Sequence, residues 1–292
     1  QFANAMTRAT GRLTRLTGLK RRPIRIRMWA HLGGKLTEIC HNRDGTIEQR
    51  FKKKAWDYVA RKIRDRPKRL SPGQMRGRVL QLFTDLERED KFPAMIVGFS
   101  CRLLNRLAHG IPSVDLTDAS QKSYIHRRFE DIRACVGPEW PMFVPLRDMC
   151  KRGIGVHHSQ QPKFYLELLP DLVRRGMVKA VFATSTLSVG IDLPCRSVVM
   201  LSLIRPGKNG FGPVEPNLLK QVMGRAGRPG LETEGNFVLA MWQQPDERVN
   251  VKELLFAPSA PCQGNGMVAP REIVTTLLHH KTAEDLLLSP FS

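Results

Sequence analysis

The stretch "VFATSTLSVGIDLPCRSVVM", residues 181–200, holds two short apolar runs on either side of a polar turn that contains a glycine. The apolar runs, at 178–184 and 196–201, have the length of buried β-strands and are too short for typical helices. Thr184 and Ser185 come at the end of the first run, which places them at the carboxyl end of the predicted strand. The stretch therefore predicts two buried strands joined by a turn that displays small hydroxyl side chains.

Apolar and helical patterns alternate on both sides of this stretch. The runs at 91–100 and 153–158 also predict buried strands, and each is followed by a helical pattern that ends at a glycine. Another strand is expected at 236–242. Strands that alternate with helices indicate βαβ units, so we predict an α/β fold with a parallel sheet and helices on both faces. Ligands of such sheets bind at the carboxyl ends of the strands, and we expect one rim to carry the site.

The charge of the chain is strongly positive and unevenly distributed. The 47 Lys and Arg residues outnumber the 27 Asp and Glu residues, which gives a formal net charge of +20. Residues 1–90 hold 23 basic and 9 acidic residues, a net +14, while the remainder holds 24 and 18, a net +6. Such an excess indicates a polyanionic partner, most often nucleic acid, although a solvated tail is the alternative for the first thirty residues. No segment has the apolar length of a membrane span, so we expect no membrane partner.

The spacing of the cysteines and the composition of the N-terminal residues indicate the cellular compartment. Six cysteines lie far apart with no C-x-x-C pair, which predicts neither a disulfide framework nor a metal bound by this chain. An intracellular reducing compartment fits this pattern. Residues 1–27 contain eight Arg or Lys and no acidic residue, as organelle transit peptides do, so a mitochondrion or another organelle is favoured over the nucleus. A basic helix that ends an upstream domain would have the same composition.

The segment "QVMGRAGRPG", residues 221–230, places Arg225 and Arg228 three positions apart among three glycines. This spacing puts both side chains on one face of a turn that begins a helix or a loop. A guanidinium group is planar and donates two hydrogen bonds at once to phosphate oxygens. The segment by itself fits either the backbone of RNA or the phosphates of a nucleotide.

Asp192, followed about thirty residues later by Q-x-x-G-R-x-G-R, resembles motifs V and VI of superfamily 2 helicases. The sequence from "GIGVHH" through "VFAT" is similar to the Ski/exosome-cofactor family of DExH RNA helicases. This resemblance implies the second RecA-like domain of such an enzyme, a P-loop NTPase-type helicase C-terminal domain. It also implies that ATP is bound by Gly190, Asp192, Gln221, Arg225 and Arg228, with the two arginines as catalytic fingers. An arginine finger is worth ~10³–10⁵ in the rate of phosphoryl transfer.

The same resemblance implies a set of RNA contacts. Ser100 and Arg102 match motif IV and would contact the nucleic-acid backbone together with Thr184 and Ser185. Hydroxyl side chains commonly bind phosphate oxygens in such interfaces. The family often has Glu at the position of Ser185 and Asn at that of Asp192, and the string "ATSTL" also occurs in related DNA-unwinding enzymes. The preference for RNA or DNA therefore stays open at the level of sequence.

Three regions are expected along the chain. Residues 1–90 form a basic linker or inter-domain segment with a hairpin and helices, and residues 91–245 form the RecA-like domain. Residues 246–292 form a linker and the start of a winged-helix region, as a short helical C-terminal extension. The phosphate-binding G-x-x-x-x-G-K-[ST] loop and a DExH box are both missing. Both motifs, and with them the Mg²⁺ that accompanies ATP, are expected in a first RecA-like domain upstream, which would be a partner of this one.

The sequence thus predicts the C-terminal half of an ATP-dependent RNA helicase that remodels RNA or ribonucleoprotein, with 3′ to 5′ movement by family analogy. The chain alone is not expected to hydrolyse ATP. One alternative is a helicase-derived, non-enzymatic rRNA-binding subunit or assembly factor of an organellar ribosome, such as the mitochondrial one. A superfamily 2 DNA helicase is the second alternative.

Overall fold

The computed structural model describes one compact unit of the chain, which spans Arg21–Pro258. The described residues are 24–42, 49–136, 141–184, 193, 195–207, 210–228, 230–243 and 246–257. The expected winged-helix start falls almost entirely on residues outside these ranges. No helix in the described ranges has both the length and the apolar character that a bilayer crossing needs.

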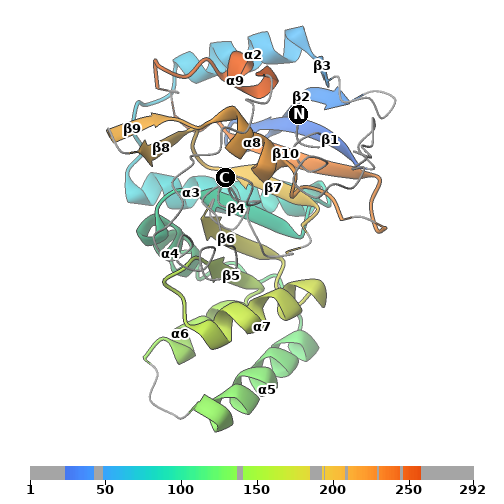
Figure 1. The fold of residues 1–292 in the computed structure, drawn as a ribbon, viewed down its shortest axis with the longest axis vertical. Coiled ribbons are helices and arrows are strands. Elements are labelled where there is room, and N and C mark those ends of the chain that lie inside the picture. The colour runs from blue at the N-terminus through green and yellow to red at the C-terminus, as the bar shows by residue number, and fades with distance from the viewer. Residues whose placement is uncertain are drawn as a thin grey trace, which may run out of the picture. The chain divides into compact units, whose positions relative to one another are not determined.

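A mostly parallel sheet forms the centre of this unit (Figure 1). Its strands are β1 Arg25–His31, β2 Leu36–Asn42, β3 Gln49–Phe51, β4 Ala94–Gly98, β5 Ile154–His157, β6 Ala180–Thr184, β7 Ser197–Met200 and β10 Glu234–Ala240. Their order across the sheet is β3-β2-β1-β10-β7-β4-β6-β5. The strands from β1 to β5 in this order are parallel, and β2 and β3 add an antiparallel edge. The predicted α/β class is confirmed.

The helices and a separate hairpin complete the unit. The helices are α2 Lys53–Arg64, α3 Pro72–Arg88, α4 Cys101–His109, α5 Ala119–Val136, α6 Phe143–Cys150, α7 Lys163–Arg174, α8 Pro216–Met223 and α9 Val251–Phe256. Strands β8 Ile204–Gly207 and β9 Gly210–Pro213 pair with each other outside the main sheet. Figure 1 shows α5, α6 and α7 near the β5 end of the sheet, and α2 and α9 near the β2–β3 end.

Helices cover both faces of the sheet, as two glycines show. A Cβ on Gly98 would lie 3.0 Å from Leu104 of α4, and a Cβ on Gly155 would lie 2.5 Å from Leu169 of α7. The register of β4, β6 and β5 puts Gly98 and Gly155 on opposite faces, because side chains alternate along each strand. The helices α4 and α7 therefore pack on opposite faces, as predicted.

The segment before residue 91 is part of the sheet. Strand β1 lies parallel to β10 along its whole length, and Met28 and Ala30 are fully buried. The sheet therefore includes a strand that precedes residue 91, the expected start of the RecA-like domain. The sequence "RIRMWAH" gave no strand prediction because alternating arginines mask its apolar face. The antiparallel pairing of β2 with β3 agrees with the predicted hairpin, whose turn lies outside the described residues.

Candidate nucleotide and nucleic-acid sites

The candidate RNA contacts lie at the carboxyl edge of the parallel strands. Gly98 pairs with Thr184, so the ends of β4 and β6 are level with each other. Ser100 follows β4 as the N-cap of α4, where its hydroxyl accepts a hydrogen bond from the backbone N–H of Leu103 at 3.2 Å. Arg102 is exposed in the first turn of that helix, and Thr184 is buried. The structure thus places Ser100, Arg102 and Thr184 at one edge, while Ser185 lies outside the described residues.

Two adjacent histidines support this edge from β5. Nδ1 of His158 accepts a hydrogen bond from the backbone N–H of Gln160 at 3.3 Å. Nε2 of His158 lies 3.1 Å from Oδ1 of Asn105 on α4 and 3.0 Å from Nε2 of Gln161. His157 is buried, and its ring nitrogens have no hydrogen-bond partner among the described residues. These contacts connect the end of β5 to the helix that carries Arg102.

The burial of His157 predicts a loss of stability in mild acid. Desolvation lowers the pKa of His157 to about 4, below the ordinary value for histidine. The unfolded chain therefore binds a proton below about pH 6.5, while the folded chain does not until about pH 4. The free energy of unfolding is expected to fall by ~3 kcal/mol over this interval. Urea unfolding at pH 7.5, 6.5, 5.5 and 4.5 measures the loss.

The variant His157→Gln is the control for this prediction, since it removes the titrating ring. Its unfolding free energy should depend less steeply on pH between 6.5 and 4.5 than that of the parent chain. Burial also lowers the pKa values of His31, His109 and His158, which leaves a smaller loss in the variant. An identical pH profile for both proteins would contradict the assignment to His157.

The two arginines of "GRAGR" follow a helix instead of beginning one. Helix α8 ends at Met223, and the backbone N–H of its C-cap, Gly224, donates to Lys220 O at 2.8 Å. The N–H of Arg225 donates to Val222 O at 3.0 Å. Of the two expected arrangements, a turn that begins a helix or one that begins a loop, the structure has the second, and this turn follows α8. The chain that leaves α8 after its C-cap, Gly224, carries Arg225 and Arg228.

The loop after α8 packs at the amino edge of the sheet. Gly227 has a φ of 89°, and its N–H donates to Cys195 O at 2.8 Å, just before β7 begins. A Cβ on Gly235, at the start of β10, would lie 2.5 Å from the carbonyl group of Ala226. The arginines are thus at the edge opposite to Ser100 and Thr184, which corrects the expectation of a single functional rim. The reason is topological, because a helix that joins parallel strands must return to the edge where the next strand starts.

Gly235→Ala is expected to disturb this loop. The added methyl group would meet backbone atoms of Ala226 and Gly227, which cannot swing aside as a flexible side chain does. We expect the free energy of unfolding to drop by ~1–3 kcal/mol, as in other overpacked sites. Urea unfolding measures this effect. Gly77→Ala on α3 is the matched control, because no atom lies within 4 Å of the added Cβ; an equal loss in both variants would contradict the close packing.

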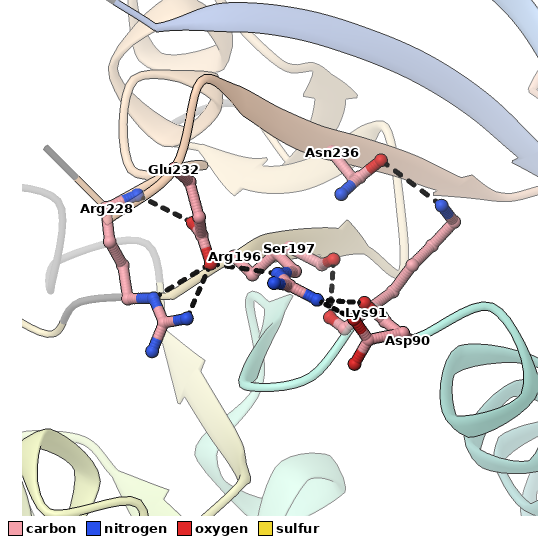
Figure 2. Close-up of polar contacts among 7 residues, drawn as sticks. All are labelled: Asp90, Lys91, Arg196, Ser197, Arg228, Glu232 and Asn236. Atoms are coloured by element: carbon pink, nitrogen blue, oxygen red, sulfur yellow. Dashed lines mark hydrogen bonds and ion pairs between the residues drawn. The ribbon is translucent and has the colours of Figure 1, made fainter. Parts of the chain in front are cut away.

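An ion-pair network holds Arg228 (Figure 2). Nε and Nη2 of Arg228 donate to Oε1 of Glu232 at 2.9 and 2.6 Å, and the backbone N–H of Arg228 donates to Oε2 at 2.9 Å. Arg196 donates from Nε to the same Oε1 at 2.9 Å and also contacts Asp90. Burial alone would raise the pKa of Glu232, but the hydrogen bonds from both arginines outweigh it and the pKa is lowered. The carboxylate is therefore ionised at neutral pH.

Sequence reasoning missed Glu232, Arg196 and Asp90. One weak signal was present, since Glu232 follows Arg228 by four residues. Among the other predicted nucleotide contacts, Gln221 is exposed on α8 and Arg225 is half-buried. Gly190 and Asp192 lie outside the described residues.

The site fits the phosphates of a nucleotide. The Arg228 side chain keeps a quarter of its surface exposed, and its Nη1 has no hydrogen-bond partner among the described residues. A guanidinium nitrogen that is held in place and still carries protons to donate suits a phosphate oxygen. Among the described residues, no group of three or more His, Cys, Asp or Glu side chains is placed so that it could hold a metal ion.

Comparisons with known proteins show what this chain is similar to. A family model, described as the helicase conserved C-terminal domain, matches residues 145–230. Superkiller complex protein 2 of Mus musculus is 29% identical over 225 residues, which cover 76% of this chain and 18% of that protein. The DExH-box ATP-dependent RNA helicase DExH11 of Arabidopsis thaliana is 31% identical over 173 residues, 58% of this chain and 13% of that protein. The ATP-dependent RNA helicase mtr4 of Schizosaccharomyces pombe is 28% identical over 160 residues, 54% of this chain and 14% of that protein.

This chain spans less than a fifth of the length of each of these relatives. The matched family region includes Thr184, Arg225 and Arg228, while Ser100 and Arg102 precede it. Residues 145–230 therefore match the helicase conserved C-terminal domain, and the chain is similar to the C-terminal part of Ski-like DExH helicases of superfamily 2.

Proposed function

We propose that this chain is the C-terminal half of an ATP-dependent RNA helicase that remodels RNA or ribonucleoprotein. The supporting observation is the division of the candidate residues between two edges of one sheet. Arg225 and Arg228 lie at the amino edge, whereas Ser100, Arg102 and Thr184 lie at the carboxyl edge. A motor must hold ATP and nucleic acid at the same time, so the two sites must not overlap.

ATP would bind between this domain and a first RecA-like domain upstream, which would also hold Mg²⁺. In this chain, Arg225 and Arg228 would contact the phosphates, with Gln221, Gly190 and Asp192 as further nucleotide contacts. ATP supplies the phosphoryl group that is transferred to water. Arg228 would stabilise the charge that develops on that group, which is the role of an arginine finger.

The domain boundaries follow from the sheet and from this proposal. We assign the described residues from 24 to 257 to one RecA-like domain, because β1 and α3 pack into the same unit as β4 and β10. This extends the domain beyond the 91–245 expected from sequence. Residues 258–292 are proposed to begin the winged-helix part.

Activity of the full-length protein tests the proposal. ATP hydrolysis is measured with single-stranded RNA and with DNA, and unwinding is measured on duplexes with 3′ or 5′ single-stranded tails. The proposal predicts stimulation by RNA and unwinding from a 3′ tail. Stimulation by DNA alone would favour the DNA helicase. RNA binding without any ATP hydrolysis would favour a non-enzymatic rRNA-binding subunit or assembly factor, which the net +14 of residues 1–90 also fits.

A further inference from the structure

Glu232 makes more contacts with Arg228 than a surface ion pair would. Its two oxygens accept three hydrogen bonds from Arg228, two from the guanidinium group and one from the backbone N–H. The Glu232 side chain is only 6% exposed. A buried carboxylate that binds both the side chain and the backbone of one residue fixes the loop as well as the guanidinium group.

Arg196 anchors this carboxylate to the rest of the sheet. Its Nε donates to Glu232 at 2.9 Å, and its own backbone N–H donates to Pro93 O at 2.9 Å. Its Nη1 contacts both the carbonyl oxygen and the carboxylate of Asp90. Asp90 has a φ of 48°, in the left-handed region that non-glycine residues seldom adopt. Asp90 follows Glu89, the C-cap of α3, and its carbonyl oxygen and Oδ2 both contact Arg196.

The network also sets the charge around Arg228. A pair of Arg228 with Glu232 alone would be neutral, but Arg196 binds the same oxygen, so the three groups together carry one positive charge. Asp90 binds Arg196, not Arg228, and its side chain is 90% exposed. The four groups together are neutral, and within them Glu232 orients Arg228 while Asp90 offsets the charge of Arg196.

We propose that Glu232, anchored by Arg196, is a positioning residue for Arg228 in ATP hydrolysis. This inference rests on the proposed function. Glu232 holds Nε and Nη2 of Arg228 and leaves Nη1 as the donor for the phosphoryl group (Figure 2). Its contribution to catalysis is expected to pass entirely through Arg228, because a misplacement of about 1 Å in a catalytic group is enough to lower a rate strongly.

Steady-state kinetics of full-length variants test this role. Glu232→Ala is expected to lower kcat by ~10–100-fold, the range typical of residues that orient a functional group. The KM for ATP and the Kd for RNA should change by less than about twofold, because binding contacts remain. Glu232→Gln, which keeps the shape and one acceptor oxygen, should fall between Glu232→Ala and the parent. Glu234→Gln is the matched control, since Glu234 lies two residues further on, contacts Arg27 and is 43% exposed; its kcat should stay near the parent value.

The double variant Arg228→Ala/Glu232→Ala decides whether the two residues act together. If Glu232 acts through Arg228, the double variant is as slow as Arg228→Ala alone and no slower. If the double variant instead shows the product of the two single losses in kcat, the proposal is overturned. A higher kcat in Glu232→Ala would also overturn it, because Glu232 would then inhibit Arg228. Thermal unfolding checks that each variant folds, and Glu232→Gln replaces Glu232→Ala in the cycle if the alanine variant does not. Unchanged kcat in Arg228→Ala would instead refute the arginine finger itself.

Discussion

Arg228→Ala in the full-length protein is expected to reduce RNA-stimulated ATP turnover by ~10³-fold or more, while the affinity for RNA stays nearly unchanged. The large effect follows from the role of a finger, which contacts the phosphoryl group as its charge develops. The small effect on RNA follows from the position of Arg228 at the amino edge of the sheet, opposite to Ser100 and Thr184. Turnover at saturating RNA and RNA binding by anisotropy measure the two quantities.

A reciprocal variant serves as the control. Arg102 is exposed at the carboxyl edge, so Arg102→Ala should weaken RNA binding and leave turnover at saturating RNA close to that of the parent. Arg228→Lys adds a second comparison. Lysine keeps the positive charge but lacks the planar guanidinium group, which binds Glu232 and leaves one nitrogen as a further donor. Undiminished turnover in Arg228→Ala would contradict the finger. A joint loss of RNA binding and turnover would contradict the separation of the two edges.

The sequence predicted those strands whose apolar runs are continuous. Strands β4 and β6 are buried along their whole length, and parallel strands covered on both faces read as uninterrupted apolar runs. Strand β1 was not predicted, because Arg25 and Arg27 alternate with buried residues in its first half and interrupt the apolar run. The β8–β9 hairpin was not predicted, because "IRPGKNGFGP" is rich in glycine and proline, which predict a loop.

The roles of the candidate site residues stay a prediction from the resemblance, and their arrangement in the fold was not predicted. The resemblance pointed to Arg225 and Arg228, yet the direction in which the chain leaves α8 decides the edge at which they lie. The pairing of Arg196 with Glu232 joins residues 36 positions apart and depends on how β7 and β10 lie side by side. Such contacts require the order and register of the strands, which neither periodicity nor spacing supplies.

The basic segment around α2 is expected to carry much of the salt dependence of RNA binding. Its exposed basic side chains include Lys53, Lys54, Arg61, Lys62, Lys68 and Arg69. Lys68 and Arg69 line an open groove with Ser202 and Gln243, which follow β7 and β10 at the carboxyl edge. The positive charge of Lys68 and Arg69 therefore adjoins the edge that carries the RNA candidates, in a groove that Asp246 and Glu247 also line.

Deletion of residues 1–90 would not test this expectation. The deletion would remove β1, the neighbour of β10, and the buried side chains of α3 that pack in the core. A loss of RNA binding would then reflect unfolding of the domain and not the loss of positive charge. Substitution of exposed side chains leaves the core intact, since the residues of α2 that are buried are Val59 and Ile63.

Replacing Lys53, Lys54, Arg61, Lys62, Lys68 and Arg69 by glutamine is expected to make the salt dependence of RNA binding shallower. Each phosphate contact with a single strand contributes about −0.7 to the slope of log affinity against log salt, so six contacts contribute about −4. Anisotropy titrations from low to moderate salt measure the slope. The control replaces exposed basic residues of α5 and α7, namely Arg127, Arg133, Lys163 and Arg174, and should change it little. An unchanged slope in the sixfold variant would mean that the α2 charges face solvent or a protein partner, and RNA would then be held by the carboxyl-edge residues alone.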